Sequence, residues 1–510
     1  MKQKQRIFLP VLLLCGMLLV LLAGCSSPQK PGGTDNGTAS ADGETTESGS
    51  GSVETPARTW EDLPRTDYGN REFMILGRDY SVWSSNDLTV SDSPSTKLDS
   101  AIFSRNTAVE ARHNIKLVSK NMTDKALTTM LEQQYMNGES DYDLYDLPLY
   151  LWGQLLLKGY FTDLTRINLL DLGESWWDSN FVSNMTLYDQ LYGIVSDATY
   201  VDKMATWSVI FNIDMISDYS LDVNLYDLVD NMEWTVERMK ELAEQVNVDL
   251  GEPGMRLEDG DIYGICGETY NIAVFYQASG TPLVSYADNE LVANIVNNKT
   301  QALNVFEKIY DLVADSTLTY NADNVDSDSR HAIGRNFFRN QQTLFMVAGV
   351  NNIVNYFTSF EHDYGILPIP MVDSAQGRYY CGLSNYGCLV FGIPVNAQDA
   401  NRSATVLQAL ACRGEKTVNP TFYNEVLKNG SSRDPDSARM LDVIFANRVY
   451  DLGVVYEFGN LLGPAYSEIG LLVKYGQRDQ FVNTIIAMEN KVKAGIEEVI
   501  AFYEKQLELQ

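Results

Sequence analysis

The chain has 510 residues, of which 45% are hydrophobic and 21% are charged, so it is long enough for about two to four domains and too apolar for global disorder. Acidic residues outnumber basic ones by 68 to 38, which gives a net charge of −30. Sequence-independent binding of nucleic acid needs clustered Lys and Arg, so this balance argues against it. Three histidines leave little imidazole for metal or acid–base chemistry.

The N-terminus has the pattern of a secretory signal. Three basic residues precede an apolar run at 7–23, which ends in the sequence LAGC, and the cysteine is Cys25. A cysteine after Ala-Gly resembles the cleavage site of bacterial lipoproteins. That resemblance implies removal of residues 1–24 and a lipid on Cys25, at the extracytoplasmic face of the cell membrane. The alternative is an uncleaved transmembrane anchor, for which the run is slightly short. Cleavage would remove three basic residues and no acidic one, so the mature net charge would be −33.

A flexible tether is expected to follow Cys25, so that residues 25–58 comprise the acylated cysteine and its linker. Residues 26–58 are rich in Ser, Thr and Gly and contain no aromatic residue. Such a segment cannot bury enough surface to offset its ordering entropy. A coil of about 33 residues spans roughly 30 Å, which suits a globular body held just off a membrane.

The first part of the remaining chain alternates strand and helix patterns. Strands are predicted at 72–76, 115–119 and 143–145, and helices at 100–113 and 123–136. This βαβαβ order indicates a parallel α/β sheet.

The pattern continues in the second half. We expect strands at 209–212 and 263–266, and helices at 300–314 and 479–509. Another helix begins after Thr235, a plausible N-cap followed by an apolar stripe at helical spacing. About 450 residues of alternating elements favour two α/β lobes over one large sheet.

Short motifs in a fixed order carry a family resemblance. They resemble those of the extracellular solute-binding proteins of ABC importers, in the carbohydrate-type group to which maltose-binding protein belongs. The stretches are GESDYDL at 138–144, KGYFTDL at 158–164, YGI at 192–194, VIFNID at 209–214, WT at 234–235, FMVAG at 345–349 and DYGILPIP at 363–370. The chain departs from the family pattern at Phe211, where Tyr is usual, and in a longer region after Cys412.

The resemblance implies a periplasmic-binding-protein-like fold, in which two α/β lobes enclose a ligand cleft and are joined by crossings near 197–209 and 363–372. Ligand contacts with both lobes would favour the closed form. The implied domains are lobe one at 59–205 and 373–414, and lobe two at 206–372 and 415–510.

The implied function is a membrane-tethered extracytoplasmic receptor. It would act as a monomer, bind a sugar or oligosaccharide without a cofactor, and deliver it to ABC permease subunits. Two alternatives stay open: a cell-surface carbohydrate-active enzyme, and a binding protein for a non-sugar solute such as a peptide.

A sugar cleft needs aromatic platforms and side chains that form hydrogen bonds. The 29 tyrosines and seven tryptophans supply enough rings, so position must decide which of them serve. By resemblance, the candidate ligand residues in cleft-facing loops are Tyr150, Trp152, Asp197, Tyr200, Trp207, Glu268, Tyr270, Asn351, Asn352, Tyr380 and Asn385, with Tyr379 and Tyr386 at the edge. For each the alternative is an ordinary place in the core or in a solvated loop.

Two other conspicuous stretches are expected to be structural. The pair Trp176-Trp177 is predicted to pack beneath the segment that leads to the first crossing. Residues 448–451 (RVYD), in a late helical region, are predicted to hold an internal ion pair.

No catalytic or metal motif is evident. The chain lacks a G-x-S-x-G elbow and an H-E-x-x-H pair. The acids at 323, 326 and 328 could be considered for Ca²⁺, but their spacing lacks the Gly and Glu of an EF-hand, so a solvated loop is expected. The isolated histidines are expected to be surface or capping residues: His113, His331 and His362.

Four cysteines remain after removal of Cys15 and lipidation of Cys25, and none forms a C-x-x-C motif. An exported protein permits disulfides. A turn-like stretch lies between Cys381 and Cys388, which could close a hairpin, while buried thiols are the alternative.

Overall fold

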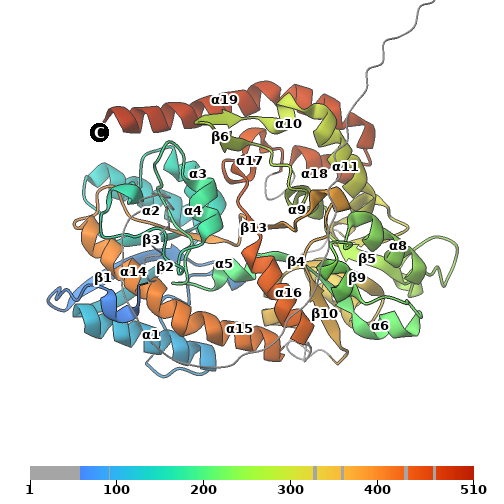
Figure 1. Cartoon of the computed structure of the whole chain (residues 1–510), viewed down its shortest axis with the longest axis horizontal. Coiled ribbons are helices and arrows are strands. Elements are labelled where there is room, and N and C mark those ends of the chain that lie inside the picture. Colours follow the sequence, from blue (N-terminus) through green and yellow to red (C-terminus); the bar gives the residue numbers. More distant parts are fainter. Residues whose placement is uncertain are drawn as a thin grey trace, which may run out of the picture. The chain divides into compact units, whose positions relative to one another are not determined.

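The computed structural model describes residues 58–90, 92–325, 330–357, 361–429, 435–462 and 467–509 (Figure 1). The predicted signal, Cys25 and nearly all of the tether lie outside these residues. Within the described ranges, no helix is both long and apolar enough to cross a membrane.

The first sheet lies in the predicted lobe one and has four strands. In spatial order they are β12 (Leu389–Gly392), β3 (Leu144–Pro148), β1 (Arg71–Arg78) and β2 (Ile115–Met122). β1 is parallel to β2 and β3, and the connections run through α1 (Lys97–His113) and α2 (Asp124–Asn137). α1 begins at a capping box between Thr96 and Asp99. The predicted βαβαβ unit is confirmed.

The second sheet lies in the predicted lobe two and has five strands. In order they are β10 (Tyr364–Leu367), β4 (Trp207–Asn212), β9 (Thr343–Gly349), β5 (Tyr263–Gly267) and β8 (Thr319–Asn321). β4 runs antiparallel to both neighbours, while β5 is parallel to β9 and β8. α8 (Val236–Val246) packs on β5 and against α11 (Lys299–Ala314). The Thr235 side chain accepts a hydrogen bond from Arg238 N, which confirms the predicted cap.

The remaining α-helices and β-strands of the described residues surround these two sheets. They are α3 (Leu149–Leu156), α4 (Ser179–Met185), α5 (Val201–Met204), α6 (Ile213–Asp218), α7 (Leu225–Asp230), α9 (Asn271–Ala278), β6 (Ser285–Ala287), β7 (Glu290–Val292), α10 (Asn294–Asn297), α12 (Arg330–Arg339), α13 (Val350–Tyr356), β11 (Cys381–Gly382), α14 (Ala400–Lys416), α15 (Val418–Asn429), α16 (Pro435–Ala446), β13 (Arg448–Val449), α17 (Leu452–Val455), α18 (Glu468–Lys474) and α19 (Phe481–Glu508).

The C-terminal region contacts helices and strands around both sheets. α15 packs on α1 and α14, whereas α16 packs on β10. α19, red in Figure 1, runs along α10, α11 and α18. Phe481 at its start stacks on Phe306 of α11 with ring centroids 4.3 Å apart, and Phe502 near its end lies 5.4 Å from the ring of Tyr192. The predicted lobe boundaries remain predictions, and these contacts show that residues after 415 touch both sides.

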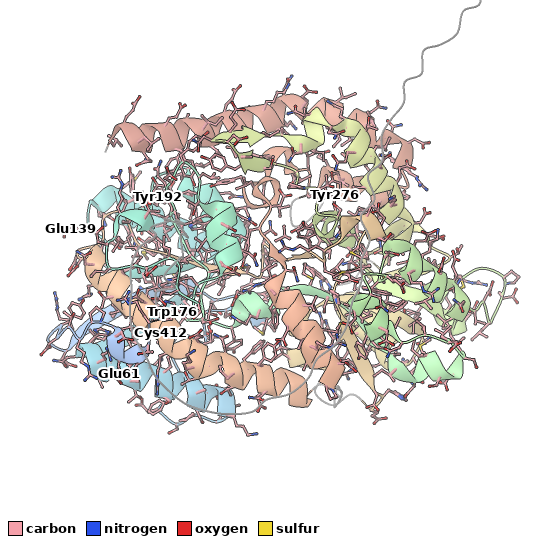
Figure 2. All side chains as sticks on the ribbon, viewed as in Figure 1. Glu61, Glu139, Trp176, Tyr192, Tyr276 and Cys412 are labelled. Atoms are coloured by element: carbon pink, nitrogen blue, oxygen red, sulfur yellow. The ribbon has the colours of Figure 1, made fainter. Side chains whose placement is uncertain are left out.

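Several large side chains fill the core (Figure 2). Trp176 and Trp177 are 1% and 4% exposed, which confirms that they pack internally. Cys266, Cys381, Cys388 and Cys412 are buried free thiols, so the 381–388 hairpin carries no disulfide.

One smaller expectation was wrong and another was confirmed. His113 is fully buried at the end of α1 and not on the surface, and burial, with a smaller effect of Arg112, lowers its pKa to about 4. The internal ion pair predicted at 448–451 is present: Arg448, on the short strand β13, pairs with the buried Asp178 and Asp202. Asp451 caps α17 by accepting from Gly453 N.

Candidate ligand-binding cleft

A cleft of about 1460 Å³ is lined by three regions of the chain. Residues 80–83 and 384–386 come from the side of the first sheet. β4, β9, the turn at 268–270 and α12 come from the side of the second sheet. The third region, at 467–475, contains α18.

Six of the predicted ligand residues line this cleft: Trp207, Glu268, Tyr270, Asn351, Asn352 and Asn385. Trp207 begins β4 and Tyr270 lies just before α9, and their ring centroids are 5.8 Å apart. Glu268 occupies the turn between β5 and α9, where its backbone N donates to Asn271 Oδ1 at 2.6 Å. Short turns after strands therefore bring together residues that are far apart in sequence.

The other five predicted residues lie outside the cleft lining. Trp152 is fully buried, and its indole N donates to Tyr192 O at 3.4 Å. It belongs to α3, which forms where a loop was expected. Tyr200 stacks on Phe422 at 4.9 Å, and the Tyr380 ring lies beside Arg378. The two that remain, Tyr150 and Asp197, take part in networks that support the cleft.

Tyr150 belongs to a set of rings held in place by a buried arginine. Arg78 is fully buried and pairs with Asp124 at 2.7 Å, and its guanidinium carbon lies 4.3 Å from the ring centroid of Tyr386 and 4.7 Å from that of Tyr80. Tyr150 stacks on Tyr386 at 5.5 Å and donates its hydroxyl to Asp124. This arrangement fixes the orientation of Tyr386 and Tyr80, both of which line the cleft.

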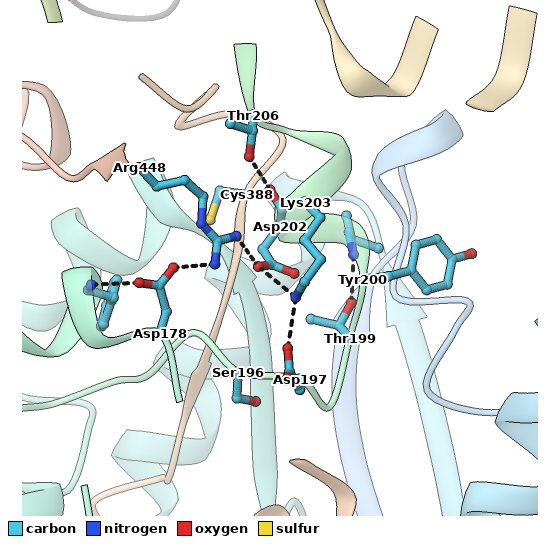
Figure 3. A network of polar contacts seen from close by, with 12 residues as sticks. Asp178, Ser196, Asp197, Thr199, Tyr200, Asp202, Lys203, Thr206, Cys388 and Arg448 are labelled. Carbon is cyan, nitrogen blue, oxygen red and sulfur yellow. Dashed lines mark hydrogen bonds and ion pairs between the residues drawn. The ribbon is translucent and has the colours of Figure 1, made fainter. Parts of the chain in front are cut away.

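Asp197 belongs to a charged network at the first crossing (Figure 3). Arg448 contacts Asp178 at 2.6 Å and Asp202 at 2.5 Å, while Lys203 contacts Asp197 at 2.8 Å. Burial raises the pKa of Asp197 even though Lys203 lies beside it. The network connects α4, the crossing segment and β13.

Polar groups accompany the aromatic residues of the cleft wall. His331 Nδ1 lies 2.5 Å from Glu268 Oε1, and Asp323 Oδ2 accepts from Thr269 N at 2.9 Å. In the described part of the chain, the buried Trp207 Nε1 and Asn385 Oδ1 have no hydrogen-bond partner. The side chains that carry these two atoms line the cleft, but the atoms themselves are covered by neighbouring protein atoms.

A metal centre has no support in the described residues, where no group of three or more His, Cys, Asp or Glu side chains is placed to hold an ion. Of the three acids considered for Ca²⁺, Asp323 lines the cleft, and Asp326 and Asp328 lie outside the described residues.

Sequence reasoning missed several lining residues. Tyr80 and Tyr475 are 44% and 62% exposed at the cleft, and Trp83, Arg335 and Tyr356 also line it. Tyr80 and Trp83 belong to a stretch without a motif, and Arg335 lies on a helix whose polar positions suggest a solvated face. No local signal in the sequence distinguishes these residues from surface residues.

Comparison with known proteins identifies the fold. No protein-family model and no curated protein matches the sequence. Solved structures that resemble the chain include the sugar-binding protein MalE from Xanthomonas citri, with 13% identity and a TM-score of 0.55 over 85% of this chain and 99% of that one. A sugar transporter from Rhizobium etli has 15% identity and a TM-score of 0.52 over 84% of this chain and 99% of that one. An ABC transporter solute-binding protein from Thermotoga lettingae, bound with α-D-tagatose, has 15% identity and a TM-score of 0.51 over 84% of this chain and 99% of that one. The chain has the two-lobe fold of ABC-importer solute-binding proteins.

This solute-binding fold confirms the predicted fold class. Nearly the whole of each similar structure is covered, so the likeness extends over both sheets and the elements around them.

Proposed function

We propose that this chain is an extracytoplasmic receptor that binds an oligosaccharide in the cleft and delivers it to an ABC permease. The observation that carries the proposal is the lining itself. Aromatic rings from both sides of the cleft, including Trp207, Tyr270 and Tyr386, lie in the same lining as the polar side chains of Asn351 and Asn352. Flat rings with hydrogen-bonding groups between them match the C–H faces and hydroxyls of a sugar.

The size of the cleft favours several linked sugar units. Its volume of about 1460 Å³ exceeds the ~300–1,000 Å³ that is typical of pockets for drug-sized ligands. The similar structures of a sugar-binding protein, a sugar transporter and a tagatose-bound solute-binding protein support a carbohydrate ligand.

A thermal-shift screen of the mature protein tests ligand class, with oligosaccharides and simple sugars as samples and peptides and metals as controls. A ligand at about 100 times its Kd adds roughly 2.7 kcal/mol of stability. With an unfolding entropy of about 0.9 kcal/mol/K for some 450 residues, that corresponds to a rise in Tm of about 3 °C. A peptide that stabilises the protein when no carbohydrate does would refute the sugar assignment.

The same ligands separate a receptor from an enzyme. A receptor returns a bound oligosaccharide unchanged after prolonged incubation. Release of shorter products, abolished by Glu268→Gln, would instead favour the carbohydrate-active enzyme, because a hydrolase needs a carboxylic acid at the scissile bond.

Membrane attachment forms part of the proposal and rests on the sequence around Cys25. Metabolic labelling with a fatty acid should mark the wild-type protein but not the Cys25→Ala variant, which should appear in the medium. Uptake of the labelled ligand by cells should require this gene together with a permease. Unchanged uptake after deletion of the gene would contradict the transport role.

A further inference from the structure

Arg335 differs from the other arginines near the cleft. It lies on α12 in the cleft wall, and its guanidinium carbon is 3.8 Å from the ring centroid of Tyr356. None of the described residues forms a hydrogen bond or ion pair with it. By contrast, Arg78 pairs with Asp124 and Arg448 pairs with Asp178 and Asp202.

The position of Arg335 is costly for a cation. Loss of hydration in the cleft wall, with a smaller effect of Arg339, lowers its pKa, whereas the nearby Tyr356 and Glu268 act in the opposite direction. The face of the Tyr356 ring offsets part of this cost and holds the guanidinium plane in one orientation. The five N–H donors of the guanidinium stay available, since a ring face accepts none of them strongly.

The acids that face the cleft are already engaged. Glu268 contacts His331, and Asp323 accepts from the Thr269 backbone. Two basic residues, Arg335 and Lys474, stand opposite these two acids in the lining. The charges of the cleft lining are therefore locally balanced in a chain whose net charge is −30. Acids elsewhere on the surface act weakly on a bound group, because the Debye length is about 8 Å at physiological salt.

We infer that the ligand carries an anionic substituent, a carboxylate of a uronic acid or a sulfate ester, which binds the Arg335 guanidinium. This inference rests on the proposed oligosaccharide function and narrows its ligand to acidic carbohydrates. A guanidinium donates two parallel hydrogen bonds to either oxyanion, and such charge-assisted pairs are stronger than bonds to sugar hydroxyls. The unpaired donors of Arg335 then have the same kind of partner as those of Arg78.

Matched glycan pairs test the inference by isothermal titration calorimetry on the mature wild-type protein. One arm compares oligogalacturonides with their methyl esters, which keep the backbone and lose the charge. The other arm compares sulfated with unsulfated oligosaccharides. The acidic member of at least one pair should bind about tenfold tighter or more, corresponding to 1.4 kcal/mol, and the responding arm identifies carboxylate or sulfate. Raising the salt concentration should weaken the binding of the acidic glycan only.

Variants then assign the effect to one side chain. Arg335→Gln should lower affinity for the acidic glycan about tenfold or more and leave the neutral member nearly unchanged, while Arg335→Lys should keep part of the preference. Arg238→Gln is the matched control, since this arginine pairs with Glu241 on the outer surface of α8. If Arg335→Gln does not fold, the affinities of the wild-type protein for the acidic and neutral members of each glycan pair still decide whether the ligand is acidic.

The outcomes separate the two proposals. Neutral glycans that bind as tightly as their acidic partners would overturn the inference and leave the oligosaccharide function standing. An acidic preference that Arg335→Gln leaves intact would also overturn it. Absence of binding to every glycan would overturn the proposed function itself, and the narrower inference with it.

Discussion

Arg448 offers the sharpest test of how the crossing is held together. Its side chain is 8% exposed, and the two carboxylates beside it, Asp178 and Asp202, are 3% and 1% exposed. Arg448→Met keeps much of the side-chain volume but removes the cation, which leaves two buried acids without their main partner. Breaking a buried ion pair from one side costs about 3–5 kcal/mol.

The remaining contacts place the expected cost near the lower end of that range. Asp178 still accepts from Tyr450 Oη at 2.7 Å and caps α4, and Asp202 still has Lys203 at 3.6 Å. With an unfolding entropy of about 0.9 kcal/mol/K for some 450 residues, a loss of about 3 kcal/mol lowers Tm by about 3 °C. Differential scanning calorimetry at neutral pH measures the shift, provided that the body unfolds in one transition.

A surface arginine supplies the control. Arg439 is 41% exposed and pairs with Asp230 and Asp436, so Arg439→Met should change stability by under about 1 kcal/mol. Adding Asp178→Asn to Arg448→Met should cost less than the two changes summed, because the uncompensated carboxylate is then gone. The reasoning fails if Arg448→Met melts no lower than the surface variant, or if the two buried changes are additive.

Three other outcomes follow from burial and from the cleft. Burial lowers the pKa of His113 to about 4 in the folded protein. As pH falls below about 6.5, the imidazole is therefore protonated in the unfolded chain before it is protonated in the folded one. The free energy of unfolding that the neutral imidazole contributes at pH 7 is then lost between roughly pH 6.5 and 4. In His113→Leu the free energy of unfolding, measured with urea, should lose about 3 kcal/mol of its change over that pH window, and an unchanged pH profile would contradict this. Because the described cysteines are free, excess dithiothreitol should leave Tm within about 1 °C, whereas loss of a disulfide would cost about 2–5 kcal/mol. Tyr386→Ala should weaken glycan binding about tenfold or more in calorimetry, while Tyr135→Ala, a ring 46% exposed and outside the cleft lining, should not; equal effects would show that Tyr386 contributes no specific contact.

The fold could be predicted because its signals are local. The strand at 72–76 and the helix at 100–113 are encoded by apolar spacing over a few residues, and they match β1 and α1 closely. Thr235 was identifiable because a cap depends only on the residues that follow it. The order of such elements, together with the motifs, was enough to indicate two lobes.

The cleft residues were easiest to predict where they directly follow a strand: Glu268 lies in the turn after β5, and Asn351 lies in the first turn of α13, which follows β9. Tyr150 and Trp152 were placed in a loop, but the sequence LYLWGQLL forms the mostly buried helix α3. Which aromatic residue of a helix faces the cleft depends on tertiary packing, and the spacing of residues in the sequence does not report that packing. The same holds for Arg335, whose importance comes from the absence of a partner in its surroundings.

The part of the chain that departs most from the family pattern also shapes the cleft. Residues 467–475 supply the exposed Tyr475 and Lys474 at its edge, while Arg448 and α19 connect the same C-terminal region to both sides of the fold. A motif comparison registers this region only as an insertion, because its contacts are made with residues hundreds of positions away. The motifs therefore specify the two lobes, and the C-terminal region adds Lys474 and Tyr475 to a cleft lining that the motifs do not describe.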